Sequence, residues 1–371
     1  MKRIVLAFTG GLDTSVAIPW LRERHGAEVV TVTLDLGQGR VLEEVRDRAL
    51  AAGAVRAHVL DVREEFAASF IVRALKADAV YEDRYPMATS LGRPLIAKKL
   101  VDVAAIEQAS AVAHGGTADG NDQIRLEAAV RALNPDLDVL APVQEWEMTP
   151  AGEVEYARAR GVAVPVAMSP YGVDANLWGR AIQYGVLEDP WTEAPEEVYT
   201  LTKAPAECPD EPAYVELSFD NGVPMAINGV EMPILELIGS LGIIAGAHGV
   251  GRIDMVENRL VGIKAREIYE APAAVVLHAA HKELQKMVVT TGVDRFARAV
   301  SLQYADTIYN GLWFTPLREA LDAFIDKVQE RVTGVIRMKL FKGDCRVVGR
   351  KSPFALYDPA PVAAATTIAT S

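Results

Sequence analysis

Apolar residues in the first half of the chain form short runs that alternate with segments of helical spacing. Four runs are short and bounded by turn residues, as expected of buried strands. The segments between them place apolar side chains three and four residues apart, which is typical of helices packed on a core. This alternation predicts an α/β fold whose parallel sheet is covered on both faces. The expected strands are Ile4–Phe8, Glu28–Leu34, Ala57–Leu60 and Ala111–Ala113, and the expected helices are Asp13–Arg24, Leu42–Ala52, Arg63–Lys76 and Leu95–Gln108.

The pattern changes near Pro165, where prolines and short strands replace the regular alternation. This mixture predicts an α+β second domain. We therefore divide the chain into residues 1–165, residues 166–357 and a low-complexity tail, 358–371, that we expect to be flexible. The elements expected in the second domain are strands Tyr214–Phe219 and Val223–Ile227, a glycine-rich segment, helices Ala271–Met287 and Arg318–Arg331, and a hairpin of Thr333–Leu340 with Cys345–Val348.

Composition limits the partners of this 371-residue chain, which has a net charge of -12 and a pI of about 5.1. Nucleic acids and anionic membranes attract basic surfaces, so we expect neither as a partner. The apolar runs are too short for a membrane helix or a signal peptide, which predicts a soluble, cytoplasmic protein. The two cysteines, Cys208 and Cys345, fit no metal-ligand spacing, so we assign no protein metal cluster and no disulfide.

The turn after the first expected strand, Phe8–Ser15 (FTGGLDTS), is a candidate anion-binding loop. Two adjacent glycines at a strand-to-helix junction let backbone N–H groups approach an anion, and the helix dipole favours negative charge. The hydroxyls of Thr9, Thr14 and Ser15 add donors, and Asp13 is placed to bind Mg²⁺ or to orient a diphosphate. The alternative is that the glycines only form a turn and that residues 13–15 only cap a helix.

This loop resembles the SGGLDTS diphosphate loop of N-type ATP pyrophosphatases, and its Leu-Asp-Thr-Ser ending resembles that of argininosuccinate synthases. Further segments resemble that family in the same order along the chain, from Met1 to about Tyr357. A collinear set is far more specific than one short motif. These segments are Tyr81–Pro86, Thr89–Lys99, His114–Arg125, Asn176–Arg180, Gly185–Pro190 and Gly249–Pro272.

The resemblance implies a nucleotide-binding domain of the adenine nucleotide α-hydrolase-like type followed by a synthetase and oligomerisation domain. It also implies a ligase that joins L-citrulline to L-aspartate in arginine biosynthesis, using ATP and Mg²⁺. In such a reaction the ureido oxygen of citrulline is adenylated, and the aspartate amine then displaces AMP. Catalysis of this kind depends mainly on alignment and charge neutralisation. A homotetramer is the assembly that the family implies.

Site residues follow from the same resemblance. Asp13, Arg93 and Asp122 are the implied catalytic residues. The implied ATP contacts are Ala7, Phe8, Thr9, Gly10, Gly11, Leu12, Asp13, Thr14, Ser15, Leu34 and Gly115. Aspartate would contact Thr117, Asn121 and Asp122. Citrulline would contact Tyr85, Ser90, Asn121, Arg125, Gly172, Ala181, Glu257 and Tyr269.

The residue types suit these roles, although simpler interpretations exist. Arg125 can grip a carboxylate with two hydrogen bonds, and Glu257 can pair with an ammonium group. Alternatively, Arg125 and Glu127 lie on a solvated helix face, and the segment Glu257–Arg259 is a surface turn.

The sequence departs from the family pattern at substrate-facing positions. Thr9 replaces a serine, Leu34 an alanine and Asp119 a lysine. Gly172 and Ala181 stand where the family generally has two serines, and the chain ends soon after residue 358, where relatives continue into a helix. Two alternatives therefore remain: the same ligase chemistry on another acceptor, and a catalytically weakened nucleotide-binding paralogue.

Overall fold

The buried apolar runs of the first half pair side by side as a five-stranded, fully parallel sheet in the order β3-β2-β1-β4-β5. The computed structural model describes residues 2–39, 42–118, 120–163 and 169–357. The prediction of a parallel sheet is confirmed, and its four expected strands are present; β5 was not predicted. The strands are β1 (Arg3–Ala7), β2 (Glu28–Asp35), β3 (Arg56–Asp61), β4 (Ala111–Ala113) and β5 (Asp138–Leu140).

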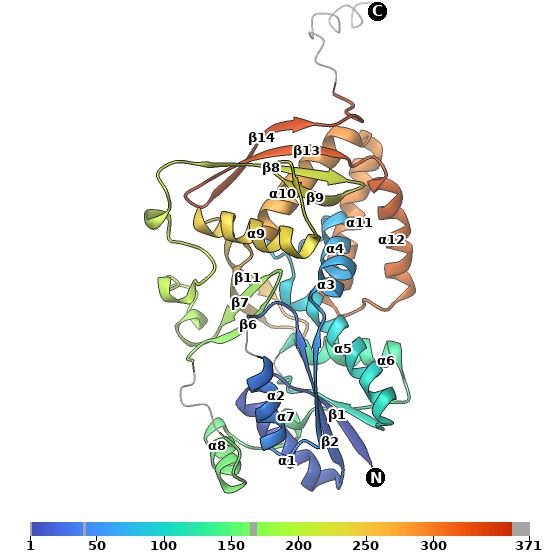
Figure 1. Cartoon of the computed structure of the whole chain (residues 1–371), viewed down its shortest axis with the longest axis vertical. Helices are drawn as coiled ribbons and strands as arrows, with labels where there is room; N and C mark the ends of the chain where they lie inside the picture. The colour runs from blue at the N-terminus through green and yellow to red at the C-terminus, as the bar shows by residue number, and fades with distance from the viewer. Residues whose placement is uncertain (1, 40–41, 119, 164–168, 358–371) are drawn as a thin grey trace, which may run out of the picture.

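Helices cover both faces of this sheet, as Figure 1 shows in its lower half. Leu6 packs with α1, α2 and α8, whereas its neighbour Val5 packs with α5 and α6, because successive strand residues point to opposite faces. The helices are α1 (Leu12–His25), α2 (Leu42–Ala51), α5 (Ala88–Glu107), α6 (Asn121–Leu133), α7 (Pro142–Glu145) and α8 (Pro150–Ala159). Helix α5 begins seven residues before the predicted start, since it continues through Pro94.

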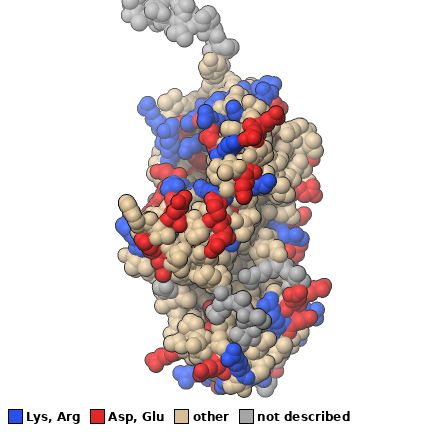
Figure 2. Space-filling model, turned by 90° about the vertical axis from the view of Figure 1, so that its left-hand side faces the viewer, with Lys and Arg blue, Asp and Glu red and all other residues tan. Residues whose placement is uncertain are grey.

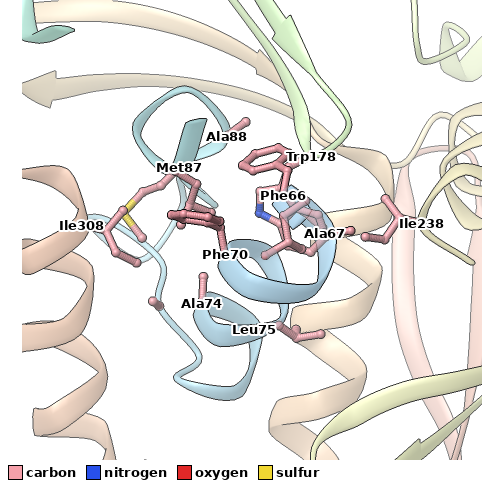
Figure 3. Close-up of a cluster of buried hydrophobic side chains, with 14 of the residues drawn as sticks. Phe66, Ala67, Phe70, Ala74, Leu75, Met87, Ala88, Trp178, Ile238 and Ile308 are labelled. Carbon is pink, nitrogen blue, oxygen red and sulfur yellow. The ribbon is translucent and has the colours of Figure 1, made fainter. Parts of the chain in front are cut away.

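A segment of the first half reaches into the second half of the molecule. It consists of α3 (Arg63–Phe66), one π-helical turn η1 (Ala67–Ile71) and α4 (Val72–Lys76). Figure 3 shows Phe66 and Phe70 from this segment beside Trp178, Ile238 and Ile308. One hydrophobic core therefore joins the two parts of the chain and fixes their relative position.

The C-terminal half contains an antiparallel sheet in the order β10-β9-β8-β13-β14, with α9 and α10 against it. The predicted hairpin is confirmed as β13 and β14. The glycine-rich segment is mostly helix α9, and α11 was not predicted. Bounds are β8 (Ala213–Asp220), β9 (Val223–Ile227), β10 (Val230–Glu231), α9 (Ile234–Ala247), α10 (Pro272–Val288), α11 (Thr291–Tyr309), α12 (Pro316–Gln329), β13 (Gly334–Phe341) and β14 (Asp344–Lys351).

A four-stranded antiparallel sheet, which the sequence pattern did not predict, lies between the two halves (Figure 1). The turn between two of its strands contacts the N-terminal half: the Leu177 backbone N–H donates to the Leu36 carbonyl at 2.7 Å, and the Trp178 indole N–H donates to the Pro86 carbonyl at 2.9 Å. Its strands are β11 (Arg252–Asn258), β12 (Lys264–Glu270), β7 (Gly179–Gln183) and β6 (Gly172–Asn176). Three short 3₁₀ helices lie between β7 and β8 in the sequence: η2 (Gly185–Glu188), η3 (Glu196–Val198) and η4 (Pro205–Glu207).

The outer surface carries charges of both signs. Figure 2 shows Lys and Arg interspersed with Asp and Glu on the face it presents, mainly over the C-terminal half. Among the residues that the structure describes, no helix has the length and apolarity needed to cross a membrane. The predicted boundary near residue 165 and the predicted tail, 358–371, lie outside the described residues.

Phe70→Ala tests the shared core. Phe70 is 3% exposed and stacks on Trp313 with ring centroids 4.7 Å apart, so truncation leaves a cavity at the junction of the two halves. We expect the free energy of unfolding to fall by about 3–5 kcal/mol. Equilibrium urea unfolding measures the change, and Phe296→Ala, at a ring that is 58% exposed, is the matched control. Equal effects of the two substitutions would contradict the packing described.

Candidate active site

One cavity of about 660 Å³ lies between the carboxyl ends of β1, β2 and β4 and the four-stranded sheet. Open parallel sheets bind ligands at this edge, where neighbouring strands send the chain in opposite directions. The predicted site residues that line it are Ala7, Phe8, Thr9, Asp13, Leu34, Tyr85, Arg93, Gly115, Thr117, Asn121, Asp122, Arg125, Gly172, Ala181, Glu257 and Tyr269. Those that do not line it are Gly10, Gly11, Leu12, Thr14, Ser15 and Ser90.

The conformation of the loop after β1 is stabilised by hydrogen bonds within the loop and from strand β2. Gly10 adopts a φ of +75°, which a side chain would strain. The Ser15 hydroxyl donates to the Gly11 carbonyl at 2.8 Å, and the Thr33 hydroxyl donates to the Phe8 carbonyl at 2.9 Å. Gly11 is the N-cap of α1 and has no side chain to occupy the first-turn amides. Residues 13–15 therefore lie within the first turn of α1 and are not its N-cap, and the helix start retains the geometry of an anion site.

A pair of carboxyl groups lies beside this loop. Glu153 of α8 is 5% exposed, and its Oε2 has no hydrogen-bond partner among the described residues. Burial, and then its hydrogen bond and charge repulsion with Asp13, raise the pKa of Glu153 to about 7. Glu153 was not predicted as a site residue, because it lies 140 residues from Asp13 in sequence and belongs to a helix of ordinary amphipathic pattern.

A chain of alternating charges crosses the floor of the cavity. Arg93 Nη2 bonds to Asp122 Oδ2 at 2.6 Å and also to Asp174, and Arg125 Nη1 bonds to Asp122 Oδ1 at 3.2 Å. Burial opposes ionisation of Asp122, but the two guanidinium groups hold its pKa at about 2. Arg125 is 3% exposed, and its Nη2 has no partner among the described residues. A solvated helix face is therefore wrong for Arg125, and one of its donors remains for a ligand carboxylate.

The opposite wall is formed by aromatic rings and a buried carboxylate. Tyr85 stacks on Tyr269 with ring centroids 3.9 Å apart, and the Tyr269 hydroxyl donates to Glu257 Oε2 at 2.6 Å. Glu257 is 3% exposed in strand β11, so the surface-turn interpretation is wrong for it. Burial raises the pKa of Glu257, while its hydrogen bonds and nearby arginines lower it in part. An ammonium group in the cavity would complement this carboxylate.

The two positions that lack a serine differ in their surroundings. Ala181 lies in β7 opposite Tyr269. At Gly172 an added Cβ would come within 2.7 Å of the Tyr184 ring, so that ring already fills the adjacent space. Ser90 is fully buried with its hydroxyl unpartnered among the described residues, and Asp119 lies outside those residues.

Several residues that line the cavity were not predicted as site residues. Arg259 Nη2 bonds to Glu267 Oε1 at 2.5 Å, and burial, as the first cause, raises the pKa of Glu267 to about 7. Four residues of the β11–β12 hairpin region line the same cavity. They form two pairs whose members are two positions apart, Glu257 with Arg259 and Glu267 with Tyr269. Strand alternation within the segment Gly249–Pro272 was the signal that would have found them. Others of this kind are Asp174, Arg180, Gln183 and Tyr184.

Comparison with known proteins matches both parts of the chain to one family. Residues 3–163 match the model of the arginosuccinate synthase N-terminal HUP domain, and residues 171–369 match that of the arginosuccinate synthase C-terminal domain. The chain belongs to the argininosuccinate synthase family.

Curated argininosuccinate synthases are similar over almost the whole chain. Those of Rubrobacter xylanophilus (54% identity over 357 residues) and Geobacillus thermodenitrificans (53% over 357) each align with 96% of this chain and with 87% and 88% of their own length. That of Bacillus pumilus is 53% identical over 358 residues, covering 96% and 89%. Among solved structures, a predicted tRNA methyltransferase subunit of Methanocaldococcus jannaschii aligns with 43% of this chain and 75% of its own at 13% identity and a TM-score of 0.29, too low to support any inference.

Gly172→Ser probes the citrulline end that the family resemblance assigns to this wall. The new Cβ would overlap the Tyr184 ring, so the free energy of unfolding should fall by about 1–3 kcal/mol. Tyr184 has a φ of +74°, which glycine adopts without strain, so Tyr184→Gly should be tolerated and should remove the overlap. Urea unfolding of both single variants and the double variant gives the coupling. Additive effects would show that the two positions do not compete for space.

Proposed function

We propose that the protein is an argininosuccinate synthase, a C–N ligase that condenses L-citrulline with L-aspartate at the expense of ATP. The observation that carries this proposal is that one cavity is lined both by Thr9 and Asp13, at the start of α1, and by the buried charged residues Arg125 and Glu257. The family membership of the whole chain supports the same reaction.

We propose that the nucleotide binds in the part of the cavity that the N-terminal half of the chain forms. Its phosphates would lie at the start of α1, where the first-turn amides and Gly10–Gly11 backbone present positive potential. The backbone near Leu34 and Gly115, which line the same cavity, would hold the adenosine part. Leu34 is 8% exposed, so its side chain contributes little free surface and mainly closes the wall.

Mg²⁺ fits the residues beside the loop. Asp13 lines the cavity, and the neighbouring Glu153 has an unpartnered buried oxygen; carboxylate oxygens are the ligands that Mg²⁺ prefers. We propose Asp13 as the residue that holds the ion, with Glu153 behind it. When bound, Mg²⁺ neutralises the phosphates and so favours departure of diphosphate.

The two amino acids occupy the rest of the cavity. Aspartate would contact Thr117, Asn121 and Asp122, whose carboxylate stays ionised and complements an ammonium group. Citrulline would lie against Tyr85 and Tyr269, with its carboxylate at Arg125 and its ammonium at Glu257; Asn121 faces both amino acids, and Gly172 and Ala181 complete the wall. Ser90 does not line the cavity, and its contact with citrulline remains a prediction.

The reaction then needs two displacements. The ureido oxygen of citrulline attacks the α-phosphorus, a new O–P bond forms, and the bond to the β-phosphate breaks to release diphosphate. The aspartate amine next forms a C–N bond to the activated carbon while the C–O bond to AMP breaks and the amine loses a proton. Neither step requires a covalent bond to the protein, so its residues align the partners and balance their charges. Arg93 lines the cavity and is held by Asp122 and Asp174, and we propose that it faces the phosphates or the incoming amine.

Assembly and location are also proposals. We propose a cytoplasmic homotetramer, as the family resemblance implies. Exposed apolar residues near the end of the described chain, namely Val348, Phe354, Leu356 and Tyr357, supply surface suited to subunit contact.

Release of diphosphate from ATP tests the function. Sustained release should require both citrulline and aspartate, and should yield argininosuccinate. Asp13→Ala should reduce the rate by at least about 10²-fold, because the ion that neutralises the phosphates loses its carboxylate ligand beside the loop. Asp136→Ala, an exposed acidic residue away from the cavity, is the matched control. Full activity of the Asp13 variant would contradict the loop assignment.

A different acceptor is the second candidate, favoured by the absence of hydroxyls at Gly172 and Ala181 and by the Tyr184 ring beside Gly172. The same assay with other ureido and amide compounds distinguishes it. Release with one of these, and none with citrulline, would replace citrulline as the acceptor while leaving the ATP chemistry in place. No release with any acceptor would favour the nucleotide-binding paralogue.

A further inference from the structure

Tyr309, the last residue of α11, lies behind the cavity wall and does not line it. Its side chain is 1% exposed, and its ring stacks on Tyr81 with centroids 3.5 Å apart and planes within 5°. The Arg125 guanidinium lies over the same ring, 4.6 Å from its centroid, and Arg125 Nε donates to the Tyr309 carbonyl at 2.7 Å. Tyr309 therefore contacts the N-terminal half of the chain from the C-terminal half.

The donor and the acceptor of each hydrogen bond at the Tyr309 hydroxyl can be assigned one after another, starting from the Leu260 N–H. The Leu260 N–H can only donate, so Asn121 Oδ1 accepts from it at 2.8 Å and the Asn121 amide nitrogen faces Tyr309. That nitrogen donates to the Tyr309 oxygen at 2.9 Å. The single hydroxyl proton of Tyr309 is left for Glu257 Oε1 at 2.7 Å, with the Asn258 carbonyl at 2.9 Å as a second acceptor.

Each oxygen of Glu257 consequently has a hydroxyl donor: Tyr309 on Oε1 and Tyr269 on Oε2. Two donors stabilise the ionised carboxylate in a buried position, and they also fix its orientation toward the cavity. Asn121 is oriented by the same hydroxyl from the other side. One phenol thus sets the orientation of two cavity residues that lie 136 positions apart in sequence.

We propose that Tyr309 is a positioning residue that couples the aspartate and citrulline subsites by aligning Asn121 and Glu257 through its hydroxyl. This inference rests on the proposed function for the identity of the two ligands. The alternative is that Tyr309 only packs in the core, for which the stacking of its ring on Tyr81 is enough. The positioning role requires the hydroxyl and the packing role does not, so a phenylalanine, which keeps the ring and loses the hydroxyl, separates them.

Tyr309→Phe separates these roles kinetically. Loss of a hydrogen bond to a charged group should raise the KM for citrulline by at least about ten-fold, with a smaller rise for aspartate. The KM for ATP should stay within about two-fold, because no nucleotide contact is changed. The matched control is Tyr304→Phe on the same helix, whose hydroxyl bonds to Asp322 at 2.7 Å, remote from the cavity residues; it should change none of the three constants.

Unchanged amino-acid KM values in Tyr309→Phe, or equal changes for all three substrates, would overturn the inference in an enzyme whose wild type is active. If the wild type does not turn over citrulline at all, the proposed function fails, and the inference is tested by a measurement that needs no substrate.

That measurement is a pH titration of the Glu257 carboxyl by difference infrared spectroscopy, with Glu257→Gln to identify its band. The titratable and charged groups that face Glu257 are Tyr269 and Glu267 from β12, Arg125 from α6, Arg259 after β11, Tyr81, Tyr85 and Tyr309. Burial raises the pKa of Glu257 and the Tyr309 hydroxyl lowers it, so Tyr309→Phe should move the midpoint to higher pH. An unchanged midpoint would show that the hydroxyl does not hold the carboxylate.

Discussion

The parallel pairing of β1 with both β2 and β4 is the constraint on which the site depends. Because the chain leaves β1 and β4 in opposite directions, a crevice opens between their carboxyl ends, and the loops after these strands both face it. The first loop supplies the helix start with its glycine N-cap, and the second supplies Gly115 and Thr117 and leads into α6, which carries Asn121, Asp122 and Arg125. The four-stranded sheet closes this crevice from the other side and makes it a cavity.

The charged side chains inside the cavity stabilise one another through ion pairs. Arg93 and Arg125 stabilise ionised Asp122, and Asp174 from the C-terminal half shares Arg93. Removing one member of such a set leaves its partner buried without compensation, which destabilises the folded protein. A charge-balanced cavity suits a reaction in which three substrates must be aligned and no residue forms a covalent bond.

The sequence allowed the parallel sheet to be predicted because its strands are buried on both faces and read as continuous apolar runs. It did not predict the four-stranded sheet, because the residues of β6 and β7 alternate too little in polarity. Helix α9 was missed because of its glycines; at Gly246 an added Cβ would lie 2.1 Å from the Leu201 carbonyl oxygen, so this glycine serves a close tertiary contact. Most of the candidate site came from the family resemblance, and sixteen of its residues line the cavity. Glu153, Asp174 and Tyr309 could not be found locally, since the cavity residues that they contact (Asp13, Arg93 and Glu257) lie 140, 81 and 52 positions away in sequence.

The proposed reaction requires that the helix start after β1 receives the departing diphosphate of ATP. A crystal structure with Mg²⁺ and a non-hydrolysable ATP analogue tests this requirement directly. We expect β- and γ-phosphate oxygens within hydrogen-bonding distance of the backbone amides between Gly10 and Ser15, with the ion at Asp13. Phosphates bound elsewhere in the cavity, with these amides left to solvent, would contradict it.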